Sequence, residues 1–286
     1  MAARRRWTSR GVDLLPAKGV TIMGIVNVTP DSFFDGGNFI DPARAIAHGA
    51  QLHRDGARIL DLGAESSRPG ALPISAEEEM KRLLPVVTAL AEIPEILISI
   101  DTTKAEVADR MLRAGAHIIN DISAMTADAS MSKVVRDHRA AVVLMHMQGT
   151  PRTMQVAPRY KDVVEEVRAY FEARLQDARN QGIHEDQIAV DPGIGFGKSL
   201  EHNLDLAANL GVLCKLGRPV CLGVSRKSFI GKLLGRELPE RLPGSLAAAS
   251  FAITHHEVDI LRVHDVKESS DTAKLIEALI ETRRRP

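Results

Sequence analysis

Short apolar stretches rich in β-branched residues alternate along this chain with longer segments in which apolar positions recur every three or four residues. The first pattern is typical of buried strands, and the second of helices with one buried face. Eight stretches predict strands, at residues 21–28, 58–62, 96–100, 117–120, 141–145, 187–190, 219–223 and 259–263. The helical pattern predicts helices at residues 42–55, 75–90, 104–114, 131–138, 160–181, 200–213, 227–234, 242–255 and 267–282.

This alternation predicts an α/β fold with a parallel sheet, because parallel strands need a crossover helix between them. Eight strand–helix units fit a closed (β/α)₈ TIM barrel, and a doubly wound open sheet is the alternative. The sequence has no linker and no low-complexity segment, so we expect a single domain over residues 19–286. Residues 1–18 are expected to form a solvated basic arm that leads into a short strand or hairpin. An RNA-binding tail is the weaker alternative for its three arginines.

Composition then narrows the function classes. The chain has 37 basic and 37 acidic side chains and ten aromatic ones (7 Phe, 2 Tyr, 1 Trp), which argues against a nucleic-acid partner. It has no apolar run of the roughly 18 residues that a membrane span needs, and no secretory signal pattern. Two cysteines, Cys214 and Cys221, are too few for a disulfide framework and predict packing thiols in a reducing cytoplasm.

Polar side chains lie within or directly after the carboxyl end of every predicted strand. Any one of them could be a helix cap, but eight at one barrel mouth would be unfavourable to desolvate without a ligand. Active sites of such barrels lie at this end, so we expect a pocket for a polar small molecule. The residues, in strand order, are Asn27, Asp61, Asp101, Asn120 with Asp121, His146, Asp191, Ser225 to Lys227, and Arg262 with His264.

The loops after these strands add anion-binding chemistry. Residues 29–37 contain paired glycines and suit a mobile loop. Residues 63–70 carry hydroxyls and Arg68, which suit an anion lid and equally an ordinary surface loop. In the segment from Ser225 to Ser228, Arg226 and Lys227 reinforce the field at the start of a predicted helix, which favours a phosphate or carboxylate.

Residues 191–199 (DPGIGFGKS) suggest a phosphate-binding loop but fail its pattern. That pattern needs a glycine where this chain has Pro192. We therefore expect a tight loop with Asp191 at its base and Lys198 at the rim or in solvent. Among the histidines, His146 and His264 lie at strand ends and could contact a ligand. No histidine pair has the spacing of a zinc site, whereas Mg²⁺ beside phosphates needs few protein ligands.

Eight motifs, in order along nearly the whole chain, resemble those of the dihydropteroate synthases. The first two are residues 23–33 (MGIVNVTPDSF) and 61–71 (DLGAESSRPGA). The others are residues 99–102 (SIDT), 115–121 (GAHIIND), 144–149 (LMHMQG), 191–198 (DPGIGFGK), 225–228 (SRKS) and 262–266 (RVHDV).

The resemblance implies a (β/α)₈ barrel enzyme of folate biosynthesis, usually a homodimer and a target of sulfonamides. It implies a transferase that joins p-aminobenzoate to 7,8-dihydropterin-6-ylmethyl diphosphate, giving 7,8-dihydropteroate and pyrophosphate, with Mg²⁺ as cofactor. We expect a dissociative, SN1-like substitution in which loops close over a pterin cation. The arylamine attacks as a neutral nucleophile, so the reaction needs no strong general base.

The resemblance also implies roles for individual residues. Catalytic roles fall on Asp31, Arg68, Asp101 and Lys227. The matches for pterin binding are Asp101, Asn120, Ile122, Met145, Asp191, Gly223 and Lys227. Those for the diphosphate are Asn27, Ser67, Arg68, Arg262 and His264, with Asn27 also as the metal ligand. Those for p-aminobenzoate are Phe33, Ser67, Pro69, Phe196 and Ser228.

Two residues of the second loop depart from the family pattern. Ala64 stands where glycine is commoner and Ser67 where threonine is commoner, so the loop's fit to p-aminobenzoate or sulfonamides is in question. Two other functions stay open. A corrinoid methyltransferase of the same barrel type would keep the pterin carboxylates without the diphosphate set. A silent barrel acting as a binding subunit should have lost some of the charged strand-end residues.

Overall fold

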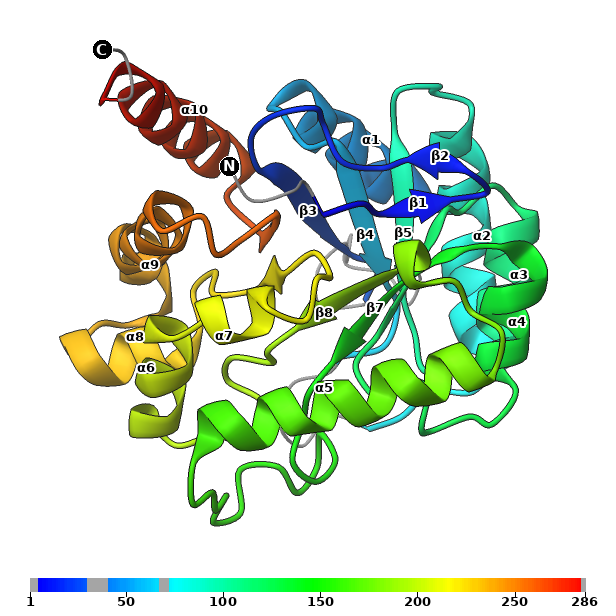
Figure 1. The fold of residues 1–286 in the computed structure, drawn as a ribbon. Helices are drawn as coiled ribbons and strands as arrows, with labels where there is room; N and C mark the ends of the chain where they lie inside the picture. The colour runs from blue at the N-terminus through cyan, green and yellow to red at the C-terminus, as the bar shows by residue number, and fades with distance from the viewer. Residues whose placement is uncertain (1–4, 30–40, 67–71, 284–286) are drawn as a thin grey trace.

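The computed structural model describes residues 5–29, 41–66 and 72–283, and places a parallel barrel inside a ring of helices (Figure 1). The strands are β1 Thr8–Ser9, β2 Val12–Asp13, β3 Thr21–Asn27, β4 Ile59–Gly63, β5 Leu97–Asp101, β6 Ile118–Asp121, β7 Ala141–Met145, β8 Ile188–Asp191, β9 Cys221–Leu222 and β10 Ile260–Val263.

The helices agree with most of the sequence prediction. They are α1 Pro42–Arg54, α2 Ala76–Ala91, α3 Ala105–Arg113, α4 Met131–His138, α5 Val163–Asn180, α6 Leu200–Ala208, α7 Gly211–Cys214, α8 Ser228–Leu234, α9 Leu242–Thr254 and α10 Val266–Arg283. Two 3₁₀ turns that the apolar pattern did not indicate are η1 Glu185–Gln187 and η2 Leu238–Arg241.

Two predicted helices differ in extent from the observed ones. The helix predicted at residues 160–181 begins only at Val163, because the Asp162 side chain accepts from the Val164 and Glu165 amides and caps it there. The helix predicted at residues 200–213 is divided into α6 and α7. The Asn209 side chain donates back to the Asp205 carbonyl at the break, and asparagine is a poor residue for a helix interior.

The sheet is a closed barrel, so the open doubly wound sheet is excluded. Its strand order is β8-β7-β6-β5-β4-β3-β10-β9, and a bridge between Val190 and Val220 joins the two ends. All these pairings are parallel, so every strand presents its carboxyl end at the same mouth. A large apolar core lies between the strands and the helices.

A second, smaller apolar cluster fills the interior of the barrel at the amino end of the strands. It contains Trp7, Leu14, Leu15, Met23, Ile59, Ile118, Ala141, Val143, Ala189, Cys221 and Ile260. Ile59, Asp61 and Gly63 share one face of β4, and the side chains on this face change from apolar to polar toward the mouth. The interior is therefore apolar at the amino end of the strands and polar at the carboxyl end.

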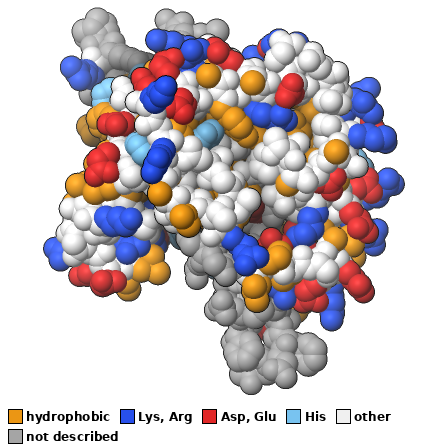
Figure 2. Space-filling model, turned by 90° about the horizontal axis from the view of Figure 1, so that it is seen from below, with side chains coloured by type: hydrophobic (Ala, Val, Ile, Leu, Met, Phe, Trp, Pro, Cys, Tyr) orange, Lys and Arg blue, Asp and Glu red, His pale blue; other side chains and the backbone are white. Residues whose placement is uncertain are grey.

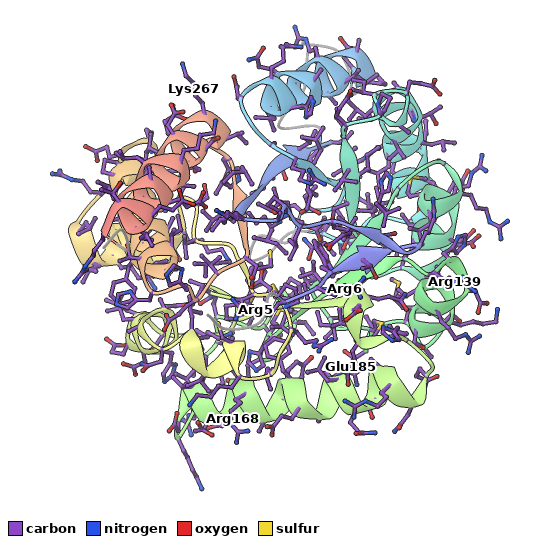
Figure 3. All side chains as sticks on the ribbon, turned by 45° about the horizontal axis from the view of Figure 1, so that its top comes forward. Arg5, Arg6, Arg139, Arg168, Glu185 and Lys267 are labelled. Atoms are coloured by element: carbon purple, nitrogen blue, oxygen red, sulfur yellow. The ribbon has the colours of Figure 1, made fainter. Side chains whose placement is uncertain are left out.

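The hairpin of β1 and β2 closes the amino end of the barrel (Figures 1 and 3). Trp7 is fully buried there, and its indole Nε1 donates to the Gln187 carbonyl at 3.0 Å. The hairpin prediction is confirmed, and in the basic arm before it Arg6 is solvated, with 61% of its side chain exposed, whereas Arg5 is largely buried. Arg5 pairs with Asp259, directly before β10, at 2.9 Å, and Arg6 pairs with Asp186 of η1 at 3.4 Å.

Candidate active site

The register of the parallel strands lines up one row of residues at the mouth. Asn27 of β3 lies beside Gly63 of β4, Gly63 beside Asp101 of β5, and Asp101 beside Asn120 of β6. Gly63 contributes no side chain to this row, and a Cβ there would lie 3.3 Å from the Asp101 Cβ. The row therefore leaves space beside the Asp101 carboxylate.

Asp61 lies one layer below this row and is fully buried. Its carboxylate accepts from Ser99 Oγ at 2.6 Å, Asn120 Nδ2 at 3.0 Å and Arg262 Nε at 2.6 Å. Three donors, one of them cationic, offset the cost of burying this charge. Asp61 thus fixes Asn120, which the resemblance assigns to the pterin, and Arg262, which it assigns to the diphosphate.

Arg262 bridges two carboxylates, since its Nη2 also donates to Asp101 Oδ2 at 2.8 Å. Burial lowers the pKa of Arg262, but Asp61 and Asp101 outweigh burial and raise it above its ordinary value. Burial raises the pKa of Asp101 to about 7, against the lowering effect of Arg262. The Asp101 carboxyl group can therefore change its charge near neutral pH.

A second carboxylate–cation pair lies across the mouth, on β8 and after β9. Burial raises the pKa of Asp191, and Lys227 opposes that effect. Burial lowers the pKa of Lys227 to about 8, and Asp191 opposes it. A Cβ at Gly223 would lie 3.7 Å from Lys227 Nζ and 3.9 Å from Asp191 Oδ2, so this glycine opens space beside both groups.

Lys227 also reaches the loop that follows β8. Its Nζ donates to the Ile194 carbonyl and lies 4.6 Å from the centre of the Phe196 ring. Phe196, assigned by the resemblance to p-aminobenzoate, is thus placed next to the proposed pterin residues. Asp191 Oδ1 accepts from the Gly193 amide at 2.7 Å, which ties the start of the same loop to the strand end.

The expectation that Lys198 lies at the rim or in solvent is wrong. Lys198 is 3% exposed, and its Nζ contacts the Gly193 and Phe196 carbonyls and His146 Nδ1, each at 3.0 Å. The loop turns through left-handed glycines and directs these carbonyls inward. Burial and the neighbouring Lys227 lower the pKa of Lys198 to about 7.

His146 is buried with Lys198 and packs edge-on against the Tyr170 ring, with 4.8 Å between ring centres. Burial lowers the pKa of His146 to about 3, and Lys198 acts in the same direction. The ring is therefore neutral at physiological pH, and its contacts are with Lys198 and Tyr170 in the wall of the site.

The segment after β9, predicted to bind an anion, turns its side chains in different directions. Ser225 Oγ lies 3.0 Å from His264 Nδ1, and Ser228 is exposed at the first position of α8. Arg226, in contrast, pairs with both Asp265 oxygens at 2.6 and 2.8 Å, because its left-handed backbone directs the side chain toward Asp265. The expectation that Arg226 adds to the field at the mouth is therefore wrong.

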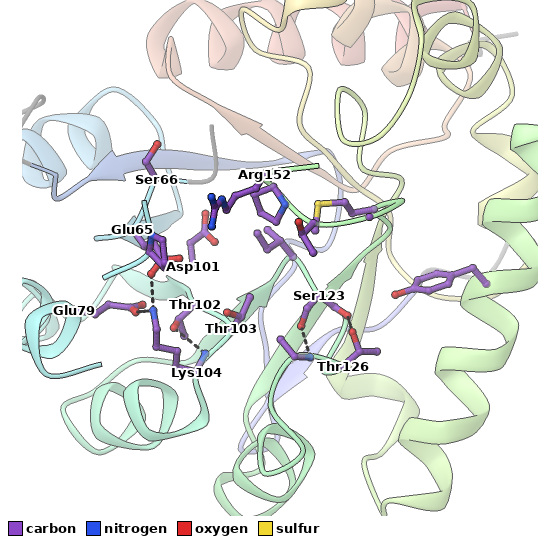
Figure 4. Close-up of a pocket in the computed structure, with 18 residues that line it drawn as sticks. Glu65, Ser66, Glu79, Asp101, Thr102, Thr103, Lys104, Ser123, Thr126 and Arg152 are labelled. Carbon is purple, nitrogen blue, oxygen red and sulfur yellow. Dashed lines mark hydrogen bonds and ion pairs between the residues drawn. The ribbon is translucent and has the colours of Figure 1, made fainter. Parts of the chain in front are cut away.

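A cavity of about 590 Å³ lies beside Asp101, between the loops that follow β4, β5, β6 and β7 (Figure 4). Lys104 Nζ bridges Glu65 and the buried Glu79, at 2.6 Å to each, and Arg152 lies over the same space. Neither Lys104 nor Glu79 was predicted from the sequence. A lysine three residues beyond a strand-end carboxylate was the available signal for Lys104.

The remaining predicted residues are placed as follows. Met145 is buried at the end of β7, and Ile122 lines the cavity beside Asp101. Ala64 is buried, and its carbonyl accepts from Arg82. Five candidates lie outside the described residues, namely Asp31, Phe33, Ser67, Arg68 and Pro69.

The described part of the chain holds no group of three or more His, Cys, Asp or Glu side chains that could bind a metal ion. Mg²⁺ bound to a diphosphate needs few protein oxygens, because phosphate oxygens and waters complete its shell. Asn27 supplies one amide oxygen donor at the end of β3, so the residues fit such a site.

Comparison with known proteins shows relatives over nearly the whole chain. A family model described as "Pterin binding enzyme" matches residues 23–264. Dihydropteroate synthase of Escherichia coli (strain K12) is 44% identical over 262 residues, 92% of this chain and 92% of that protein.

Solved structures agree in fold. A Yersinia pestis dihydropteroate synthase with a sulfonamide drug complex superposes with a TM-score of 0.90 at 39% identity, covering 96% of this chain and 99% of that one. A dihydropteroate synthase from Xanthomonas albilineans in complex with 7,8-dihydropteroate superposes with a TM-score of 0.85 at 39% identity, covering 98% and 100%.

Proposed function

The chain belongs to the pterin-binding enzyme family, among its dihydropteroate synthases, and we infer from this how its own residues divide the reaction. The enzyme is a transferase that joins p-aminobenzoate to 7,8-dihydropterin-6-ylmethyl diphosphate and releases pyrophosphate. The assignment of residues rests on two carboxylate–cation groups at the carboxyl-terminal mouth of the barrel. These are Asp61 and Asp101 with Arg262, and Asp191 with Lys227.

The pterin ring is held by groups that match its polar edge. A carboxylate is an acceptor with two oxygens, so Asp191 can accept two pterin N–H groups side by side. The Asn120 amide offers both a donor and an acceptor, and Asp61 holds it in place through a 3.0 Å hydrogen bond. Lys227 donates to a ring carbonyl or ring nitrogen, and Gly223 leaves room for the ring beside it. Met145 and Ile122 supply apolar walls.

The bond from the pterin methylene carbon to the diphosphate oxygen breaks first, and its electron pair leaves with the diphosphate. Ionised Asp101 then faces the positive charge that develops on the pterin, in a site where charge interactions are strong. Arg262, together with His264 and Arg68, compensates the negative charge of the leaving group. When a diphosphate binds, Arg262 keeps its Nε bond to Asp61 and turns its Nη2 from Asp101 to the diphosphate, which frees the Asp101 carboxylate for the cation.

Asn27 would hold Mg²⁺ against the diphosphate. When bound, the ion supplies positive charge that stabilises the departing pyrophosphate. Asn27 lies at the mouth in the same row as Asp101, with only Gly63 between them.

The arylamine attacks the methylene cation with its nitrogen lone pair and then loses one proton. Phe196 follows β8 next to Lys227, and exposed Ser228 follows β9. We assign the aromatic ring and the carboxylate of p-aminobenzoate to these two residues. We propose that Phe33, Ser67 and Pro69 complete this subsite and that Asp31 joins Asp101 at the cation when the first loop closes. Closure excludes water, which would otherwise capture the cation.

The activity is tested by pyrophosphate release in reactions that contain both substrates or only one. Release that needs both supports the assignment, and release from the pterin diphosphate alone at the same rate contradicts it. Omission of Mg²⁺ with excess chelator is expected to reduce the rate, and an unchanged rate would remove the metal from the proposal. A sulfonamide is expected to raise the apparent KM for p-aminobenzoate without lowering kcat.

We also propose that the enzyme forms a homodimer through helices α8, α9 and α10. These elements and η2 expose large apolar side chains, with Phe251 45% and Leu275 63% exposed. Leu233, Leu234, Leu238 and Leu279 are at least half exposed on the same elements. Burying such side chains against a second copy would stabilise the pair. Sedimentation of wild type and Phe251→Lys tests this, with Val12→Lys on the distant hairpin as the control.

The enzyme is proposed to act in the cytoplasm. Both cysteines are free thiols in the structure, which suits a reducing compartment. None of the described helices is long and apolar enough to cross a membrane. On the face shown in Figure 2, Lys and Arg side chains are interspersed with Asp and Glu.

A further inference from the structure

The loop between β8 and α6, residues 192–199, lies between the two substrate subsites proposed above. Asp191 precedes it, and Phe196 is its only aromatic residue. The loop packs closely against the loop after β7, where a Cβ at Gly193 would lie 1.9 Å from the His146 carbonyl oxygen and one at Gly197 2.5 Å from that of Gln148. Glycine is required at both positions, since the backbone conformation is left-handed there as well.

Lys198 holds this loop from the inside. An ammonium group has three N–H bonds, and Lys198 Nζ has three acceptors at 3.0 Å: the carbonyls of Gly193 and Phe196, and His146 Nδ1. His146 is neutral, so its Nδ1 can accept while its other nitrogen carries the hydrogen. Two of the acceptors belong to the loop and the third to His146, directly after β7, and together they use the three N–H bonds of the ammonium group.

Other contacts hold the loop from its outer side. Asn203 Oδ1 accepts from the Gly195 amide at 2.6 Å, and the Tyr160 hydroxyl donates to the Gly197 carbonyl at 2.9 Å. Lys227 Nζ donates to Ile194 from the substrate side. Lys227 thus contacts both the loop and the site, whereas Lys198 contacts its own loop and His146.

We propose that Lys198 is a positioning residue for the reaction: it sets the shape of residues 192–197, and so places Phe196 for p-aminobenzoate and Asp191 for the pterin. This inference rests on the function proposed for the site. The charged and titratable groups that face Lys198 are His146 on one side and Asp191 and Lys227 on the other. Because the loop contributes to both subsites, its loosening weakens substrate binding more than it slows the chemical step.

The test compares Lys198→Ala with wild type in steady-state kinetics and in calorimetric binding of the pterin diphosphate. We expect the KM for p-aminobenzoate to rise at least tenfold and the Kd of the pterin diphosphate to rise severalfold, while kcat falls less than either change. Propylammonium chloride should restore much of both losses, because the small cation can occupy the space of the lysine side chain. Propanol at the same concentration has the size without the charge and should restore nothing.

Two further variants complete the design. Lys215→Ala removes an exposed lysine and is expected to match wild type. Lys198→Gln keeps two N–H donors, so we expect an intermediate KM from it, and it decides the matter if the alanine variant does not fold. Folding is checked by thermal unfolding followed by circular dichroism.

Unchanged KM and Kd in a folded Lys198→Ala or Lys198→Gln variant overturns the inference, as does equal restoration by propanol. Failure of the function proposed for the site is distinguishable, since wild type itself would then not release pyrophosphate in the presence of both substrates. The binding measurement is independent of turnover.

Discussion

Replacement of Trp7 by alanine tests the role of the amino-terminal hairpin. Trp7 is fully buried and packs into the interior cluster at the amino end of the barrel. Truncation of a buried tryptophan to alanine typically costs about 3–5 kcal/mol of unfolding free energy. The Gln187 carbonyl also loses the indole donor at 3.0 Å, which adds about 1 kcal/mol or more. We therefore expect Trp7→Ala to lower the free energy of unfolding by about 4–6 kcal/mol.

The assay is urea unfolding followed by far-ultraviolet circular dichroism. Trp7 is the only tryptophan, so its fluorescence is lost in the variant and cannot serve as the common signal. Trp7→Phe keeps an aromatic ring but loses the hydrogen bond and some volume, and it should cost about 1–2 kcal/mol. Val12→Ala changes a side chain of the same hairpin that is 62% exposed, and should stay within about 0.5 kcal/mol of wild type.

A free energy of unfolding of Trp7→Ala within about 1 kcal/mol of wild type would refute the reasoning, because packing of the hairpin would then contribute little to stability. The KM values for both substrates should stay unchanged wherever the variant is folded. This follows because the hairpin lies at the opposite end of the strands from the mouth.

Three other predictions concern the charged groups. Asp101 has a pKa of about 7, and its ionised form faces the cation, so kcat/KM for the pterin diphosphate should rise as pH increases through 7. The value of kcat/KM should fall again as pH increases through about 8, because Lys227 then loses its proton. Asp101→Asn should remove the acidic limb and lower kcat about 100-fold or more, so a flat wild-type profile from pH 6 to 9 would contradict this assignment. Arg262→Met leaves buried Asp61 without its cation and should cost about 3–5 kcal/mol in urea unfolding. Partial recovery is expected in the double variant with Asp61→Asn, and equal stability of Arg262→Met and wild type would disprove the coupling. Lys104→Met similarly leaves buried Glu79 uncompensated and should cost about 3–5 kcal/mol, recovered in part by Glu79→Gln, whereas Lys133→Met at an exposed ion pair should cost less than about 1 kcal/mol.

The strands and their order could be predicted from the sequence, because each is a short apolar run between polar loops. The strand predicted at residues 141–145 matches β7, and the helix predicted at residues 131–138 matches α4. Helix boundaries were less predictable where a cap decides them. Asp162 starts α5 by accepting backbone amides, a contact that the apolar spacing of residues 160–181 does not reveal.

The site was predictable at the strand ends and less so for long side chains. Asn120, Asp101 and Asp191 have short side chains, so their backbone position nearly fixes where their polar atoms lie. A lysine or arginine can reach in several directions, and its partner is decided by strands far away in sequence. Lys198 turns inward to the carbonyls of its own loop, and Arg226 turns away to Asp265.

Asp61 could be found in the sequence, but its hydrogen-bond partners could not be predicted. A carboxylate in the middle of an apolar strand was visible in the sequence, and it lies two residues before Gly63 on the same face of β4. Its role as the common acceptor for Ser99, Asn120 and Arg262 requires β5, β6 and β10 to be in place around it. That arrangement exists only once the barrel is closed.

Closure of the barrel has a consequence for synthesis of the chain on the ribosome. The first barrel strand, β3, pairs with the last, β10, and Glu277 of α10 accepts from the Val20 amide at 2.7 Å. Translation proceeds at roughly 5–20 residues per second, so one edge of β3 stays without its partner for roughly 10–50 s after it is made. An unpaired strand edge is a template for aggregation. We therefore expect the nascent chain to depend on chaperones until β10 has emerged.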